Sequence, residues 1–451
     1  MELSDGSRIG VIGGGPAGSL ASYFLLEMAR LVDLQLELDI YESRDFSLPG
    51  PASCNMCGGI ISESLVQMLA LEGINLPPSV VQRGIDSYVM HTDLKKVCIR
   101  TPLEEMRIAA LHRGSGPKGC RPGQWESFDG FLLNLACEKG AIQKRSRVEE
   151  IRWENGKPVI RAKGHPEQSY DLVVGCVGIN SPGLKLFQNL RFPFQQPNTT
   201  KTCILEIQLG HEKIQKYLGN SMHVFLLDIP RLEFAAIIPK GEYVTICMLG
   251  REVDQELVNR FMSSPEVRNC LPLEWEPELW ACRCLPKINI KGRRHIFSDR
   301  IVLVGDCGVS RLYKDGIGAA YRTAKACAVT AIFHGVSKRD FQKYYWPVCK
   351  FMEMDNNIGK IMFKSGVFFR KMSFLRQAMI QTVFKEQKSN NKHRTMSTLL
   401  WNMFTGSAPY RDIVLCSLKP AFIFSFSVEI LKAIFGLRRE SYLSSKVTNL
   451  K

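Results

Sequence analysis

The chain has 451 residues, of which 45% are hydrophobic and 23% are charged. These are ordinary globular values, so they exclude a disordered chain and a coiled coil, and the length suits two or three domains of about 150 residues. The net charge is +15, and residues 331–451 hold 20 Lys and Arg against 7 Asp and Glu. This concentration of charge near the C-terminus favours an anionic surface as the partner of that region.

The first segment of the sequence, Met1–Arg8, is polar and does not resemble a secretory signal. The 15 cysteines are scattered, and several of them, such as Cys98 and Cys203, lie inside apolar runs. Both features favour reduced thiols over disulfides. We expect a cytoplasmic protein, either free or attached peripherally to a membrane.

The N-terminal region reads as strand, turn, helix and strand. A short apolar run, Arg8–Ile12, leads into the turn Gly13-Gly14-Gly15-Pro16-Ala17-Gly18, and Ser19–Leu34 then has the apolar spacing of a helix. Leu36–Tyr41 alternates like a strand and ends at Glu42, whose carboxylate can accept hydrogen bonds from a ribose diol. This order predicts a dinucleotide-binding unit, the alternative being a glycine turn without a ligand.

Each residue of the turn has a physical role in such a unit. Gly13 permits the tight turn, Gly15 lets the backbone approach a pyrophosphate, and Gly18 allows close packing of helix on strand. Pro16 and Ala17 complete the turn, and the N-terminus of the helix that follows offers free backbone N–H groups to the phosphates.

Two stretches in the middle of the chain have strand patterns. Val81–His112 and Thr202–Leu249 alternate apolar and polar residues and are rich in β-branched and aromatic side chains. Gly114–Gly123 is rich in Gly and Pro and is expected to be a loop. We expect the two strand regions to form an antiparallel sheet that covers the nucleotide.

Two further strands lead into glycine-containing turns. Tyr170–Val174 is followed by Gly175-Cys176-Val177-Gly178, and Arg300–Val304 is followed by Gly305-Asp306-Cys307-Gly308. Gly316-Ile317-Gly318 then opens a helix of small residues. An aspartate at a strand end, next to a helix start with two glycines, can hold a ribitol hydroxyl and the edge of a polarised ring.

After Ala331 the pattern is helical, with Lys and Arg interleaved among large apolar residues, as in Ile361–Arg376. A basic amphipathic helix suits a membrane surface or a partner groove, and the alternative is a helical subdomain packed on the body. Pro420–Val428 has no charge but is far shorter than the about 20 residues of a membrane span. Nucleic acid is not expected as a partner, because no binding motif accompanies the charge.

The glycine turn, the strand before Gly175 and the Gly305-Asp306 segment occur in the order seen in flavin-dependent oxidoreductases of the para-hydroxybenzoate hydroxylase type, which this sequence resembles. The resemblance implies FAD, with its ADP half on the glycine turn and Asp306 on the ribitol and pyrophosphate. Gly316, Ile317 and Gly318 belong to the same cofactor site. No second GxGxxG turn follows a strand, so electrons would come from transiently bound NAD(P)H or a protein donor.

Within this group the sequence is similar to the geranylgeranyl reductases. The cysteine loop of that family matches Cys54-Asn55-Met56-Cys57-Gly58-Gly59, and its YxWxFPKG strand matches Phe234–Gly241, with Ala236 in place of Trp. Leu285-Pro286 before the last strand also recurs in the family, and Ser127–Leu132 resembles its FDxxL helix start. Trp125 occupies the place of the flavin-contacting arginine of the family, so we assign that role to Arg121.

The family resemblance implies reduction of C=C bonds in a prenyl lipid, by hydride from reduced FAD and a proton from the protein. The candidate donors or orienting groups are Cys57, Tyr313 and Lys314, although a solvated loop would also explain the last two. Cys54 and Cys57 have the spacing of a redox or catalytic pair. Zinc binding with Cys282 and Cys284 and two inert thiols are the alternatives, and we expect no metal.

We therefore expect an α/β fold with a Rossmann-type FAD-binding domain, an inserted antiparallel sheet that binds substrate, and a C-terminal helical region. The FAD-binding domain is expected to comprise residues 1–80, 113–180 and 296–335, the substrate domain 81–112 and 181–295, and the basic helical region 336–451. The rival functions are an FAD-dependent aromatic monooxygenase and a flavin-binding protein without catalysis.

Overall fold

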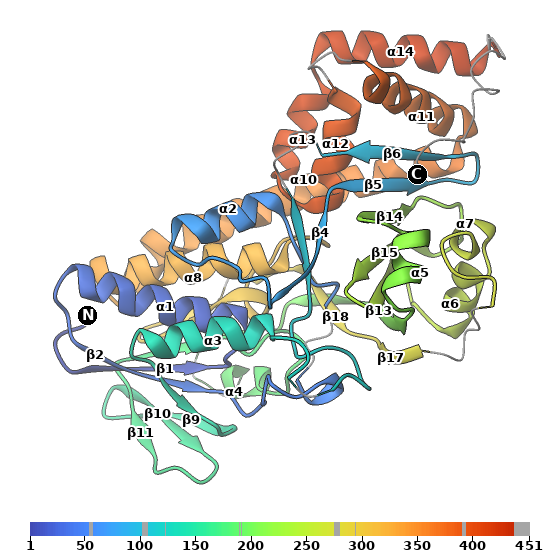
Figure 1. Cartoon of the computed structure of the whole chain (residues 1–451). Coiled ribbons are helices and arrows are strands. Elements are labelled where there is room, and N and C mark those ends of the chain that lie inside the picture. The colour runs from blue at the N-terminus through green and yellow to red at the C-terminus, as the bar shows by residue number, and fades with distance from the viewer. Residues whose placement is uncertain are drawn as a thin grey trace.

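The structure is a computed structural model that describes residues 1–53, 57–101, 107–121, 123–188, 190, 192–274, 280–293, 295–389 and 394–436. Figure 1 shows three regions. A helix-covered sheet with the N-terminus lies at the left, a second sheet lies at the right, and the C-terminal helices lie above it. The predicted fold class is confirmed.

The first region is built on a six-stranded sheet in the order β19-β20-β12-β1-β2-β8. All its strands are parallel except the edge strand β19. Apolar side chains of the central strands are fully buried beneath the helices, which explains their near-continuous hydrophobic runs. The elements are β1 (Ser7–Ile12), β2 (Leu36–Tyr41), β8 (Ile142–Lys144), β12 (Leu172–Gly175), β19 (Phe297–Ser298) and β20 (Ile301–Leu303), with α1 (Pro16–Leu31), α3 (Phe128–Glu138) and α8 (Gly316–Phe333).

The second region is an eight-stranded sheet. Its strands follow the order β17-β13-β16-β15-β14-β5-β6, and β18 also pairs with β13. The sheet is antiparallel except where β5 runs parallel to β14. This pairing of β5 with β14 joins the two strand regions that were predicted from the sequence. The strands are β5 (Ser87–His91), β6 (Lys96–Arg100), β13 (Asn198–Gln208), β14 (Ser221–Phe225), β15 (Leu232–Lys240), β16 (Tyr243–Gly250), β17 (Trp280–Cys284) and β18 (Lys287–Lys291).

The two faces of this sheet have different coverings. On one face Leu205, Ile237 and Val244 belong to a core that also contains residues of α5 (His211–Tyr217), α6 (Gln255–Met262) and α7 (Pro265–Arg268). On the other face Tyr88 and Phe234 share a core with Trp401 and other residues of the C-terminal helices. Because side chains alternate along each strand, residues 234, 236, 238 and 240 of β15 all face this second side.

Two smaller sheets accompany these regions. The sequence patterns did not predict these two three-stranded sheets, β11-β10-β9 and β3-β7-β4. The remaining elements before the C-terminal helices are β3 (Ile60–Ile61), β4 (Val81–Ile85), β7 (Ile108–Leu111), β9 (Val148–Glu154), β10 (Lys157–Ala162), β11 (Gln168–Ser169), α2 (Glu63–Leu71), α4 (Leu184–Gln188), and the short turns η1 (Gly50–Ala52) and η2 (Gly305–Cys307).

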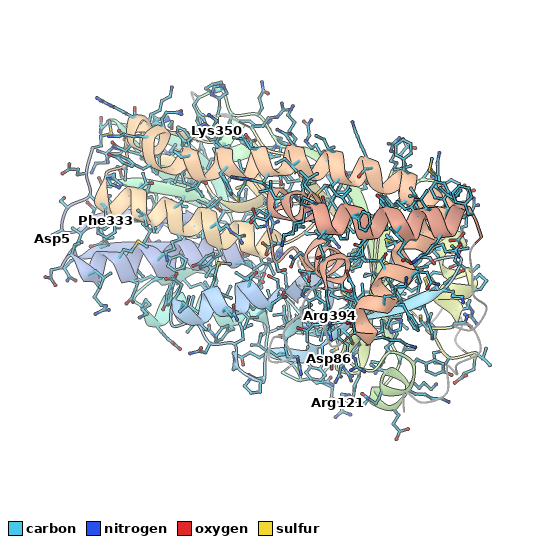
Figure 2. All side chains as sticks on the ribbon, turned by 90° about the horizontal axis from the view of Figure 1, so that it is seen from above. Asp5, Asp86, Arg121, Phe333, Lys350 and Arg394 are labelled. Atoms are coloured by element: carbon cyan, nitrogen blue, oxygen red, sulfur yellow. The ribbon has the colours of Figure 1, made fainter. Side chains whose placement is uncertain are left out.

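The described part of the C-terminal region is mostly helical, and its last helix ends at Ile434. In Figure 2, α8 and α10 run side by side along the molecule, with Phe333 at the end of α8 and Lys350 near the start of α10. No single helix in the described part of the chain is long and apolar enough to cross a membrane, although α13 and α14 pass that test together with a bend of 70° between them. The elements are α9 (Lys338–Asp340), η3 (Phe341–Tyr345), α10 (Trp346–Lys371), α11 (Ser373–Lys388), α12 (Thr395–Thr405), α13 (Tyr410–Ser417) and α14 (Pro420–Ile434).

Candidate active site

The glycine turn lies at the carboxyl end of β1, in the middle of the parallel sheet. Gly13 has a φ of +104°, a conformation that favours glycine. A Cβ on Gly18 would overlap the carbonyl oxygen of Gly13, so α1 approaches the strand closely only because residue 18 is glycine. Gly15 is the N-cap of α1 and no side chain caps this end, and Pro16 occupies the first turn. The first N–H groups of α1 are therefore available to an anion.

Glu42 lies beside this turn, as the sequence predicted. Its Oε2 accepts a hydrogen bond of 2.9 Å from the amide of Gly14, and its Oε1 accepts one of 2.8 Å from the amide of Arg44. These bonds hold the carboxylate at the end of β2. Since a carboxylate has about four acceptor positions, it can still accept hydrogen bonds from a ribose.

A buried ion pair that the sequence analysis missed faces the same turn. Arg113 Nε and Nη2 donate to the two carboxylate oxygens of Asp129 at 2.9 and 2.8 Å, and the side chain of Asp129 is 0% exposed. A Cβ on Gly15 would lie 3.5 Å from Arg113 Nη2. Burial acts to lower the pKa of Arg113, but Asp129, with smaller effects of Cys57 and Asp306, outweighs it and raises that pKa. Arg113 therefore lies between the glycine turn and two other predicted site residues, Cys57 and Asp306.

Asp306 lies in the turn η2, between the ends of α1 and α8. A Cβ on Gly316 would lie 3.7 Å from Asp306 Oδ1, and a Cβ on Gly305 would lie 2.8 Å from the Cβ of Ala17. Burial raises the pKa of Asp306, against the effects of Ser310 and Arg113. The structure thus brings the second predicted segment to the first.

The start of α8 is fixed by its own cap. The Gly318 amide donates to Asp315 Oδ1 at 3.1 Å, and a Cβ on Gly318 would overlap that carboxylate. Asp315 is in turn paired with Arg311 and Arg322 at 3.0 and 2.9 Å. Gly318 makes room for this cap and Ile317 is buried in the core, so Gly316 is the residue of the predicted motif that faces Asp306.

Lys314 extends from the loop before α8 to the antiparallel sheet. Its Nζ lies 3.4 Å from the centre of the Phe234 ring, which is a cation–π contact. Burial lowers the pKa of Lys314 to about 7, and Cys247 only partly opposes this shift. An amine with this pKa can both hold and release a proton near neutral pH.

The loop that carries Cys57 packs on the same face of the sheet. A Cβ on Gly58 would lie 3.0 Å from Cys247 Sγ, and one on Gly59 would lie 2.7 Å from Lys240 Nζ. Burial raises the pKa of Cys247 to about 12. Lys240 acts to lower this pKa, and Cys57 adds to the increase. Cys57 is half-buried, and its Sγ accepts a hydrogen bond of 3.4 Å from the Gly59 amide.

Three more polar residues near this side of the sheet, Lys240, Glu206 and His112, were not predicted. Lys240 is 1% exposed, although it lies inside the Pro-Lys-Gly segment quoted from the sequence. Burial raises the pKa of Glu206, and its carboxylate accepts a hydrogen bond of 2.9 Å from Thr245. His112 Nε2 is buried and has no hydrogen-bond partner among the described residues. Nothing in the sequence distinguished these side chains from ordinary strand residues.

The other predicted residues lie outside this cluster or outside the described residues. Tyr313 packs edge-to-face on Phe363 of α10 at 4.8 Å, and burial followed by Glu233 raises its pKa to about 12. Arg121 is exposed, and its contact with Gln124 is made by its backbone amide rather than its guanidinium. Cys54 lies outside the described residues.

The candidate zinc ligands are engaged elsewhere on β17. Cys282 Sγ accepts a hydrogen bond of 2.9 Å from the Lys118 amide, and Cys284 contacts the carbonyl of Ile204. Among the described residues, Cys57 belongs to no group of three metal-ligating side chains.

Comparison with solved structures shows which proteins share this architecture. A geranylgeranyl bacteriochlorophyll reductase-like protein from Thermoplasma acidophilum matches with a TM-score of 0.62 and 15% identity, over 97% of this chain and 100% of that protein. The p-nitrophenol 4-monooxygenase PnpA from Pseudomonas putida DLL-E4 matches with a TM-score of 0.60 and 13% identity, over 90% of this chain and 98% of that one. The halogenase PltM, in complex with FAD, matches with a TM-score of 0.58 and 12% identity, over 96% and 92% of the two chains.

No protein-family model matches the sequence, and no curated protein is similar to it at a significant level. The chain shares its fold with these solved structures. That fold is shared by reductase-like proteins, monooxygenases and halogenases, so it does not by itself choose among their reactions.

Proposed function

We propose that this chain is an FAD-dependent oxidoreductase that reduces C=C bonds of a prenyl lipid. The observation that carries the proposal is the position of Lys314. Its amine lies over Phe234 and near Cys247, the residue against which the Cys57 loop also packs, and its own loop leads directly to Gly316 of the predicted cofactor site.

The residues around the first turn fit FAD. The uncapped end of α1 offers N–H groups, Gly15 leaves its approach open, and Arg113 adds a positive charge against the same turn. Glu42 would hold the adenosine ribose, and Asp306 with Gly316 would hold the ribitol side. When bound, reduced FAD supplies hydride. The electrons that reduce it are proposed to come from NAD(P)H or a protein donor.

Saturation of a C=C bond also requires a proton. Lys314 carries one at pH values below its pKa of about 7. Its position over the Phe234 ring places the ammonium among apolar side chains, where transfer to carbon does not compete with bulk water. The Cys57 loop borders the same region, and we assign Cys57 the role of orienting the substrate or relaying the proton.

The sheet face around Lys314 is suited to a hydrocarbon chain. Phe234, Ala236 and Ile238 follow one another along one side of β15. Ala236 pairs in register with Cys247 and occupies the position where the resembled family has tryptophan. Alanine is smaller than tryptophan, and Ala236 is buried here in the core shared with the C-terminal helices.

Anaerobic turnover tests this proposal. The FAD-loaded protein would be reduced chemically without oxygen and incubated with prenyl lipids, and the products would be analysed by mass spectrometry. We expect a gain of two hydrogens for each reduced bond, and a large loss of rate in Lys314→Met. Hydroxylated aromatic products with matching oxygen consumption would instead identify a monooxygenase. A flavin that cannot be reduced would indicate a binding protein.

We also propose that α14 attaches the protein to a membrane surface. One side of the helix packs on the body through Phe426, which stacks on Phe369 at 6.3 Å. On the opposite side Phe424 is 74% exposed and Leu431 is 52% exposed, and Phe435 continues this stripe. A protein rarely leaves such an apolar helix face in water, and the basic charge of the C-terminal region complements anionic lipids.

A further inference from the structure

A buried group of two histidines and one cysteine lies on the other face of the eight-stranded sheet. His91 ends β5, His223 lies in the neighbouring strand β14, and Cys270 follows α7, which covers this face. The three side chains belong to residues that are 5%, 6% and 2% exposed. They alternate with Met90, Met222 and Val224, which face the C-terminal helices, so this group is separate from the candidate active site.

The three potential ligand atoms face a common point. His91 Nε2 lies 2.9 Å from His223 Nδ1, and Cys270 Sγ lies 3.2 Å from His223 Nδ1 and 3.7 Å from His91 Nε2. Nitrogen and sulfur ligands at ordinary bond lengths from Zn²⁺ are separated by about 3.3–3.8 Å. Shifts of about half an ångström or less would convert the observed triangle into a coordination site.

The surroundings keep the imidazoles neutral and oriented. Burial lowers the pKa of His91 to about 3 and that of His223 to about 4, so both rings have lone pairs at neutral pH. His223 also hydrogen-bonds the backbone of Leu218, the kind of outer contact that orients a metal-ligating ring. The ring of His91 stacks on Phe225 at 4.7 Å. Neutral, oriented imidazoles are what metal binding requires.

The thiol completes a soft donor set. Burial raises the pKa of Cys270 to about 12, whereas the nearby Lys96 acts to lower it. A bound cation would displace the thiol proton, and the resulting thiolate would offset part of the cation's charge. Two imidazoles and one thiolate in a buried site suit a closed-shell ion of the late first row.

We propose that His91, His223 and Cys270 bind one Zn²⁺ or Cu⁺ ion, which ties α7 to strands β5 and β14. The site would be structural, because it links three elements that are distant in the sequence: the strands β5 and β14 and the helix α7 that covers them. It does not depend on the proposed reductase activity.

Metal analysis of the intact protein tests this proposal. The protein would be purified without chelators, dialysed separately against Zn²⁺ and against Cu⁺ under reducing conditions, and analysed for bound metal. We expect about one ion per chain, and a loss of at least tenfold in affinity in Cys270→Ala and His223→Gln. Cys203→Ala, a fully buried cysteine in the same core, is the matched control and should keep its metal.

A spectroscopic measurement covers the case in which these variants do not fold. Co²⁺ bound to the unmodified protein should show a thiolate-to-cobalt charge-transfer band, with release of the thiol proton. Absence of bound metal after both dialyses would overturn the proposal. So would metal that persists in Cys270→Ala, or a cobalt spectrum without thiolate.

Discussion

Arg113 and Asp129 form a bidentate ion pair that lies against Gly15, the N-cap residue of α1. This pair places a positive charge beside uncapped helix N–H groups. The N–H groups attract an anion, and Arg113, although paired with Asp129, is close enough to Asp306 to interact with it. The combination is the strongest structural reason to place the diphosphate of FAD at this point.

The first prediction concerns this pair. Arg113→Gln removes the charge and breaks the ion pair with the buried Asp129, so we expect FAD affinity to fall at least tenfold and the free energy of unfolding to fall by about 3 kcal/mol. Asp129→Asn should destabilise the protein with a smaller effect on FAD. Fluorescence titration and urea unfolding would measure the two effects. Arg121→Gln is the control, and an equal loss of FAD affinity there would restore the role predicted from the sequence.

The second prediction separates two glycines of the turn. A Cβ on Gly18 meets the backbone of Gly13, so Gly18→Ala should lower the free energy of unfolding by about 3 kcal/mol or more. The nearest atom to a Cβ on Gly15 is 3.5 Å away, and the φ of Gly15 is −71°, so Gly15→Ala should fold normally. It should nevertheless weaken FAD binding, because the methyl group occupies the approach to the helix. Equal FAD binding by Gly15→Ala and the unmodified protein would argue against this placement.

The third prediction is a pH dependence of product formation. Because the pKa of Lys314 is lowered to about 7, its protonated fraction falls as the pH rises through 7. With a proton donor required, the anaerobic rate of substrate reduction should fall over the same range. Lys314→Met should be slow and lack this limb of the profile. Tyr313→Phe is the control: if Tyr313 only packs on Phe363, its profile should keep the limb, whereas loss of the limb would make Tyr313 the donor.

The fourth prediction tests the exposed face of α14. Replacing both Phe424 and Leu431 with Glu should reduce flotation with anionic vesicles at least tenfold, because it removes apolar area and adds negative charge. Leu273→Glu, at a position 88% exposed on another part of the molecule, is the matched control and should bind as before. Vesicle binding that is unchanged in the double variant would exclude α14 as the attachment site.

The sequence predicted best where function restricts the local backbone. The turn from Gly13 to Gly18, its acid Glu42 and the Asp306 segment could be found because each requires particular residues at fixed spacing after a strand. The fold class followed from the order of these segments, and the alternating patterns indicated the second sheet. The pairing of β5 with β14 could not be foreseen, because strand pairing depends on contacts between distant segments.

The part of the candidate site that faces the antiparallel sheet was less predictable for the same reason. Arg113 is recognisable only through Asp129, sixteen residues later, and Lys240 only through the loop that folds over it.

The three residues His91, His223 and Cys270 are separated by more than a hundred positions from first to last and carry no motif. Their relationship arises from the sheet, not from spacing.

Titration of the purified protein with FAD tests the central claim most directly. The account predicts a flavin absorption spectrum and a stoichiometry of one FAD per chain, with binding weakened in Gly15→Ala and in Arg113→Gln. A colourless protein that takes up no FAD, although folded, would contradict the placement of a dinucleotide at the end of α1 and with it the proposed reaction.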